Sequence, residues 1–91
     1  MIEAVRHEAE RISSKILGTR WYLFGSFTRN PRGAADVDVL VVCRSHADAI
    51  RIREEIHDVC SDWPLHLLLM TDSEEEQTKF IVSEGCVLLS H

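Results

Sequence analysis

Four residues near the start of the chain have the types and the spacing that phosphate chemistry requires. Gly25 and Ser26 follow an aromatic and apolar segment, and Asp36 and Asp38 enter an apolar run after a spacer of nine residues. Glycine lets the backbone approach a ligand because it has no Cβ, and a serine with free N–H groups at a helix start can bind phosphate. Two aspartates at alternate positions of a strand point to the same face, where they can share a hard cation. The unit therefore predicts a phosphate cradle beside a divalent-metal site.

Each half of this unit also has a simpler interpretation. Gly-Ser after a strand is most often a turn, and Asp-x-Asp at the start of a strand is often a solvated edge. The combination is more specific, because Asp38 lies beside a strongly apolar run, where a carboxylate without a neutralising partner would be costly. We therefore interpret the unit as a site for nucleotidyl transfer, in which metal ions neutralise charge on the transferred phosphoryl group.

The elements that position these residues follow from the periodicity of the apolar side chains. The pattern predicts, in order, a helix, a strand, a short helix or turn, a strand, a helix, a strand, a helix and a strand. The last helix can be capped by Thr71 or by Ser73, of which Ser73 with Glu76 fits a capping box, and it ends at Gly85. The other helices are expected at residues 2–17 and 46–60, with the short helix or turn at 28–33. The strands are expected at residues 20–24, 36–43, 65–70 and 86–89. Alternating strands and helices predict an α/β fold, with helices mainly on one face of the sheet.

The first two long helices should each bury one apolar face. Their expected inner positions recur every three or four residues and are Ile2, Val5, Ala9, Ile12, Ile16 and Leu17 in the first helix and Ile50, Ile56, Val59 and Cys60 in the second. The three cysteines, Cys43, Cys60 and Cys86, are widely spaced. We interpret them as small apolar residues rather than as a zinc site or a disulfide framework.

Length and charge exclude several classes of function. The 91 residues are 45% hydrophobic and 27% charged, which is typical of one globular domain over residues 1–91. The net charge of −5 disfavours direct binding of nucleic acid. The start does not resemble a signal peptide, and the longest apolar run, Leu67–Met70, is far shorter than the roughly 20 residues of a membrane span. We therefore expect a cytoplasmic protein without a membrane partner, whose small size favours a homodimer or another partner.

The segment Phe24-Gly25-Ser26, followed by Asp36-Val37-Asp38-Val39, resembles the signature of the nucleotidyltransferase superfamily related to DNA polymerase β. That signature begins with an apolar residue, then Gly, then a position that is either Gly or Ser. After a spacer it continues with Asp, an apolar residue, a position that is either Asp or Glu, and a second apolar residue. The short chain and the run Gly-Ser-Phe-Thr-Arg-Asn are similar to the minimal nucleotidyltransferases of prokaryotes. The resemblance covers about residues 10–90 and implies the nucleotidyltransferase fold, with a small mixed β-sheet.

The resemblance also implies roles by position. Gly25 and Ser26 would contact the β- and γ-phosphates of a nucleoside triphosphate, with ATP expected, and Asp36 and Asp38 would bind Mg²⁺ or Mn²⁺. Arg29 could reach a phosphate, its alternative being a solvated helix residue. The implied reaction transfers a nucleoside monophosphate to a hydroxyl. Minimal members often pair with an all-helical HEPN-family protein in toxin–antitoxin modules, where that partner can carry the acceptor hydroxyl.

One position departs from the family pattern. The family has a third catalytic carboxylate on the strand expected at 65–70, where the only polar residue is His66. His66 can be a core or edge histidine with a satisfied hydrogen bond, a general base without a metal role, or the mark of a site that keeps the nucleotide but has lost catalysis. We therefore predict a nucleotidyltransferase of weakened or altered activity, with Asp36, Asp38 and His66 as catalytic residues. The alternative is a catalytically degenerate antitoxin module that binds a nucleotide or a partner.

Overall fold

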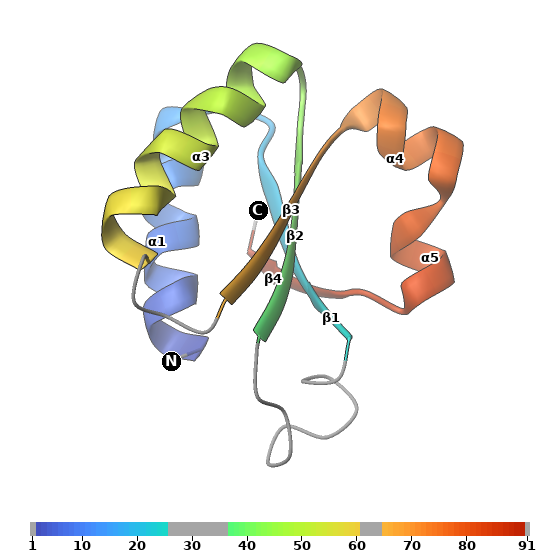
Figure 1. Cartoon of the computed structure of the whole chain (residues 1–91), viewed down its shortest axis with the longest axis horizontal. Helices are drawn as coiled ribbons and strands as arrows, with labels where there is room; N and C mark the ends of the chain where they lie inside the picture. The colour runs from blue at the N-terminus through green and yellow to red at the C-terminus, as the bar shows by residue number, and fades with distance from the viewer. Residues whose placement is uncertain (1, 26–36, 61–64, 91) are drawn as a thin grey trace.

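The computed structural model describes residues 2–25, 37–60 and 65–90, and their arrangement is shown in Figure 1. The helices and strands, in chain order, are α1 (Ile2–Lys15), β1 (Arg20–Phe24), β2 (Val37–Cys43), α3 (His46–Cys60), β3 (Leu65–Thr71), α4 (Asp72–Thr78), α5 (Phe80–Glu84) and β4 (Val87–Ser90). The expected strands are therefore present, whereas the short helix or turn expected at 28–33 lies outside the described residues.

The four strands form one sheet in the order β3-β2-β1-β4. β1 runs antiparallel to both β2 and β4, and β2 runs parallel to β3. A parallel pair needs a crossover connection rather than a tight turn, and α3 supplies it. The prediction of a small mixed sheet is confirmed.

Helices α1 and α3 lie side by side over one face of the sheet (Figure 1). The strands contribute alternate residues to this face because successive side chains point to opposite sides. The buried core contains Val5, Ala9, Ile12 and Ile16 of α1, Trp21 of β1, Val37, Val39, Val41 and Cys43 of β2, Ile52 and Ile56 of α3, and Leu89 of β4. This face is the one that the apolar periodicity predicted.

Two residues expected in the core are exposed instead, Leu17 and Ile50. Leu17 lies beyond the end of α1, where Gly18 turns the chain with a φ of +81°. In α3 the inner side chain is Ile52, four residues before Ile56 and thus on the same helix face. Ile50 lies two residues before Ile52, which rotates it by about 200° around the helix axis, to the outer side.

Helices α4 and α5 lie on the other side of the sheet (Figure 1). The ring of Phe80 in α5 packs edge-on against the ring of Phe24 in β1, with 5.0 Å between ring centroids, a favourable aromatic geometry. The single helix expected up to Gly85 is divided in two, because Lys79 adopts a left-handed conformation with a φ of 53°. Helices therefore flank both faces, with the two longer ones on the core side.

The cap of α4 is Thr71, one of the two predicted candidates. Its Oγ1 accepts a hydrogen bond from the Glu74 backbone N–H over 3.2 Å, and Glu74 Oε1 accepts one from the Thr71 backbone N–H over 2.9 Å. This is a capping box that lies two residues before the predicted pair of Ser73 and Glu76. That prediction is wrong because β3 continues to Thr71 and the helix begins at once, at Asp72.

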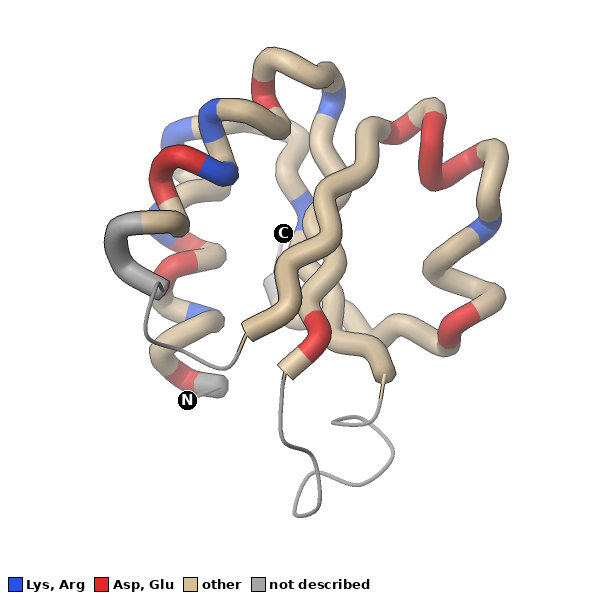
Figure 2. The backbone as a smooth tube through the Cα atoms, in the orientation of Figure 1, with Lys and Arg blue, Asp and Glu red and all other residues tan. Residues whose placement is uncertain are grey.

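Charge is concentrated on the helices, as Figure 2 shows. Within β2 and β3, Asp38 is the only Asp, Glu, Lys or Arg. In the described part of the chain, every helix is too short or too polar to cross a membrane.

Candidate active site

The strand register brings Phe24, Asp38 and His66 together on three neighbouring strands. Phe24 of β1 pairs with Asp38 of β2, and Asp38 pairs in turn with His66 of β3. Directly paired residues of adjacent strands project from the same face of a sheet. The three side chains therefore lie in a row at the end of β2 where the chain enters the sheet, on the face opposite the α1–α3 core.

Asp38 and His66 are in direct contact. The distance from His66 Nδ1 to Asp38 Oδ1 is 3.2 Å, and the contact is an ion pair when the imidazole is protonated. The Asp38 side chain is 23% exposed, whereas that of His66 is 71% exposed. Both sequence neighbours of Asp38, Val37 and Val39, are buried, so the carboxylate lies at the boundary between the apolar sheet and solvent. A carboxylate in such a place is stabilised by a cation or a hydrogen-bond donor, and His66 is placed to act as one.

Gly25 leaves the space that the Asp38 carboxylate occupies. Its φ is +76°, and a Cβ at this position would lie 2.2 Å from Asp38 Oδ2. No side chain fits at that distance, and a left-handed conformation itself disfavours residues with a Cβ. The structure thus gives Gly25 a role toward Asp38. Its predicted role, close approach of the backbone to a phosphate, stays a prediction.

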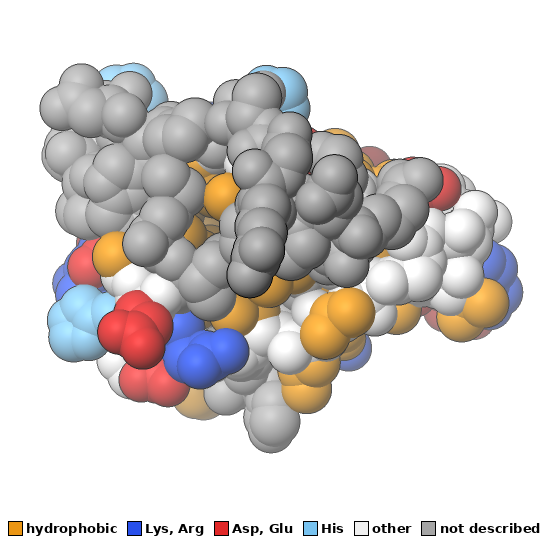
Figure 3. Space-filling model, turned by 90° about the horizontal axis from the view of Figure 1, so that it is seen from below, with side chains coloured by type: hydrophobic (Ala, Val, Ile, Leu, Met, Phe, Trp, Pro, Cys, Tyr) orange, Lys and Arg blue, Asp and Glu red, His pale blue; other side chains and the backbone are white. Residues whose placement is uncertain are grey.

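Three predicted site residues, Ser26, Arg29 and Asp36, lie in the segment 26–36, outside the described residues. Their assignment to phosphate and metal therefore stays a prediction. Within the described ranges, no group of three or more His, Cys, Asp or Glu side chains comes together in a way that could hold a metal. Figure 3 views the molecule from this end of the sheet, and the described side chains seen near the centre of that view are largely hydrophobic.

The chemistry of the described donors fits a divalent cation. Asp38 offers hard carboxylate oxygens, and Mg²⁺ is commonly held by one or two carboxylates together with substrate phosphates. The missing Cβ of Gly25 leaves the space that this carboxylate occupies. His66 adds an imidazole nitrogen beside it, a donor that suits Mn²⁺ better than Mg²⁺. The resulting pair is one oxygen donor and one nitrogen donor on a single face of the sheet.

One neighbour of the site was not anticipated from the sequence. Phe80 of α5 packs against Phe24, the strand partner of Asp38. The two rings come from distant parts of the chain, so no local spacing could have indicated the contact. Phe80 connects the α4–α5 segment to the strand that leads into Gly25.

The chain was compared with known proteins. The family described as nucleotidyltransferase domain matches residues 3–89. A crystal structure assigned to a nucleotidyltransferase is similar with a TM-score of 0.63 and 20% sequence identity, covering 84% of this chain and 87% of that chain. No curated protein matches. At this identity the structural likeness shows a shared fold, and the family match covers almost the whole chain.

Proposed function

Because the chain belongs to the nucleotidyltransferase domain family, we propose that it transfers a nucleoside monophosphate from a nucleoside triphosphate, ATP first, to an acceptor hydroxyl. The acceptor oxygen forms a bond to the α-phosphorus, the bond from that phosphorus to the β-phosphate oxygen breaks, and pyrophosphate leaves. The hydroxyl proton passes to a base. The observation that carries this proposal is the placement of Asp38 beside His66, with its carboxylate in the space left by Gly25.

Asp38 is proposed as a ligand of Mg²⁺ or Mn²⁺, together with Asp36. A bound cation neutralises charge on the triphosphate and orients its oxygens. Gly25, Ser26 and Arg29 are proposed to contact the phosphates, as the family pattern implies. Support from the structure is confined to Asp38 and to the space that Gly25 leaves for its carboxylate, because Asp36, Ser26 and Arg29 lie outside the described ranges.

His66 is proposed as the base that receives the hydroxyl proton. The parallel register places it beside Asp38 on the same face, the place where the family pattern requires a third carboxylate. In the contact of 3.2 Å, an Nδ1–H that donates to Asp38 Oδ1 leaves the lone pair on Nε2, which is the form a general base needs. Asp38 would then orient the ring in addition to binding the cation, as carboxylates do for histidines in many sites.

The same histidine favours a second candidate function. An imidazole has no permanent negative charge and is a softer donor than a carboxylate, so the cation that activates the acceptor would be held less firmly. The chain would then bind a nucleotide or a protein without turnover. Its net charge of −5 suits the masking of a basic, RNA-binding surface.

For both functions we propose an all-helical HEPN-type protein as partner, carrying the acceptor hydroxyl in the first. Support for this partner comes from the short chain and the family resemblance. The acidic charge of the chain agrees with a basic partner surface.

The test combines calorimetric binding with transfer of labelled ATP, in Mg²⁺ and in Mn²⁺, with and without the partner. Asp38→Asn should abolish both binding and transfer. Asp48→Asn is the matched control, because Asp48 is a carboxylate of similar exposure, 22%, in the first turn of α3. If the partner is labelled by the wild type but not by Asp38→Asn, the result supports the enzymatic function. Binding without transfer in every condition supports the second function, and the absence of both binding and transfer overturns the two proposals.

A further inference from the structure

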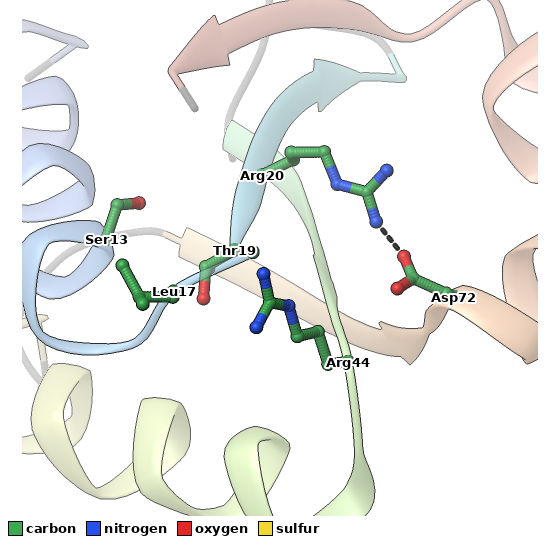
Figure 4. Close-up of a pocket in the computed structure, with 7 residues that line it drawn as sticks. Ser13, Leu17, Thr19, Arg20, Arg44 and Asp72 are labelled. Carbon is green, nitrogen blue, oxygen red and sulfur yellow. Dashed lines mark hydrogen bonds and ion pairs between the residues drawn. The ribbon is translucent and has the colours of Figure 1, made fainter.

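A hollow of about 630 Å³ lies at the opposite end of the sheet from Asp38 (Figure 4). Its walls come from α1, the α1–β1 connection, the start of β1, the residue that follows β2 and the first residue of α4. This is the carboxyl end of the parallel pair, where Cys43 of β2 pairs with Thr71 of β3.

The hollow is separate from the candidate active site. Arg44, in its wall, lies six residues beyond Asp38 along β2 and its continuation. At about 3.3 Å per residue this places the two about 20 Å apart. A small anion therefore cannot contact both, and binding at one end can be measured without binding at the other.

The hollow carries positive charge although the chain is acidic overall. Arg20 and Arg44 both line it, together with a single carboxylate, Asp72. Arg20 forms an ion pair with Asp72. Arg44 has no ion pair or side-chain hydrogen bond with any residue in the described ranges. One guanidinium thus remains available to a ligand.

The Arg44 side chain passes through the space that a Cβ on Gly18 would fill. A Cβ on Gly18 would lie 2.3 Å from Arg44 Nε and 2.9 Å from Arg44 Cδ, and the φ of Gly18 is +81°. The arginine side chain therefore lies directly on the backbone of the turn that ends α1. Figure 4 shows it directed toward Thr19 and Leu17, whereas Arg20 turns toward Asp72. Arg44 is exposed, so its guanidinium can turn toward a ligand in the hollow without losing an interaction with the described residues.

A hydroxyl in the same wall, that of Ser13, has no partner among the described residues. Ser13 Oγ is covered from solvent and makes no hydrogen bond with the residues that the structure describes. A buried hydroxyl without a partner is unfavourable, and a ligand in the hollow would satisfy it once the Ser13 side chain turned outward. Thr19 differs, since its Oγ1 already donates to the Ile16 carbonyl over 2.7 Å.

We propose that this hollow is a binding site for a small phosphate-class anion. Arg44 provides a planar pair of N–H donors, which match two oxygens of a phosphate, and Ser13 Oγ, once turned toward the hollow, donates to another. Arg20 adds positive charge from the side of Asp72. The anion can be inorganic phosphate, pyrophosphate or the terminal phosphate of a nucleotide, which share this chemistry. The proposal does not depend on catalysis at Asp38.

The test is a titration of the ¹⁵N-labelled full chain with inorganic phosphate, pyrophosphate and metal-free ATP, at constant ionic strength, followed by NMR. Saturable shifts are expected at the amides of Ser13, Gly18 and Arg44. Arg44→Gln should weaken this binding about tenfold or more, because it removes a charged hydrogen-bonding partner. Arg53→Gln is the matched control, since it removes the same charge from an exposed position of α3 outside this hollow.

The three probes distinguish the source of the anion. Saturation by inorganic phosphate identifies a free-phosphate site, and saturation only by ATP or pyrophosphate identifies a larger phosphate ester or anhydride. The proposal is overturned if Arg44→Gln binds all three probes as the wild type does, if none of the probes gives saturable shifts, or if the shifts are confined to Gly25 and Asp38. The last result would place the anion in the candidate active site instead.

Discussion

Alanine at Gly25 should damage the protein in a way that alanine at Gly85 does not. Both glycines are left-handed, with φ of +76° and +63°. A Cβ on Gly25 would meet Asp38 Oδ2 at 2.2 Å and Asp38 Cγ at 3.1 Å, whereas a Cβ on Gly85 would meet nothing within 4 Å. Gly85→Ala therefore measures the conformational penalty alone, and Gly25→Ala measures that penalty plus displacement of the Asp38 carboxylate.

The magnitudes follow from these contacts. A left-handed conformation costs a residue with a Cβ about 1–2 kcal/mol, which is the expected loss of unfolding free energy for Gly85→Ala. At Gly25 the carboxylate must move away, and overpacking of this kind adds about 1–3 kcal/mol. Because 1 kcal/mol lowers the Tm of a domain of this size by about 4–8 °C, the two variants should be clearly separated.

The assay is urea and thermal unfolding followed by circular dichroism, extended to a double-mutant cycle with Asp38→Ala. Truncation of Asp38 removes the two atoms that lie nearest to the added Cβ. In the Asp38→Ala background, Gly25→Ala should lower the free energy of unfolding only as much as Gly85→Ala does. The coupling energy between Gly25→Ala and Asp38→Ala is then about 1–3 kcal/mol. Equal losses for the two glycine substitutions in the wild-type background would refute the reasoning.

Four further predictions concern the cap, a thiol and the active site. Thr71→Val should lower the unfolding free energy by about 1 kcal/mol in urea melts, because the Glu74 N–H loses its acceptor. The hydrogen bond from the Thr71 backbone N–H lowers the pKa of Glu74 below its usual 4.5. The ionised Glu74 carboxylate therefore contributes stability above pH 4.5, and this contribution is lost as the pH falls through the lowered pKa. Glu74→Gln should make acid unfolding curves less steep, and an unchanged curve would contradict this. Burial raises the pKa of the Cys43 thiol, so a variant with serine at the two other cysteines should react with a thiol reagent at pH 8 only after unfolding. His66→Asp should raise nucleotidyl transfer in Mg²⁺ relative to Mn²⁺, because it places an oxygen donor beside Asp38. An unchanged ratio of the two rates would count against His66 as a nitrogen donor beside the cation.

The sequence by itself determined the local parts of this protein. The alternation of apolar residues in β2 and their recurrence in α1 are properties of short segments, and they located these elements within a residue or two. The motif from Gly25 to Asp38 identified the candidate site. A strand, a glycine and a later Asp-x-Asp are defined by their order in the sequence, so they can be recognised without the tertiary structure. Thr71 was recognised as a cap candidate for the same reason.

Only the tertiary structure decided which distant residues meet. The contact of His66 with Asp38 depends on the parallel register of β3 against β2, which is set by the packing of α3 and the whole sheet rather than by residues near either position. The packing of Phe80 on Phe24 depends on the break at Lys79, which ends one helix and starts another.

The same distinction applies to Gly18 and Gly25, which each lie against a side chain that is distant in the sequence. A glycine in a sequence indicates conformational freedom, but not which side chain fills the space it leaves. At Gly25 that side chain is Asp38, and at Gly18 it is Arg44. Both contacts join a glycine close to an end of β1 to β2 or to the residue that follows β2. They exist because the antiparallel pairing of β1 with β2 brings each end of one strand beside an end of the other. Pairing energies are distributed over the whole sheet, so the short-range pattern that predicts a strand does not specify its neighbours.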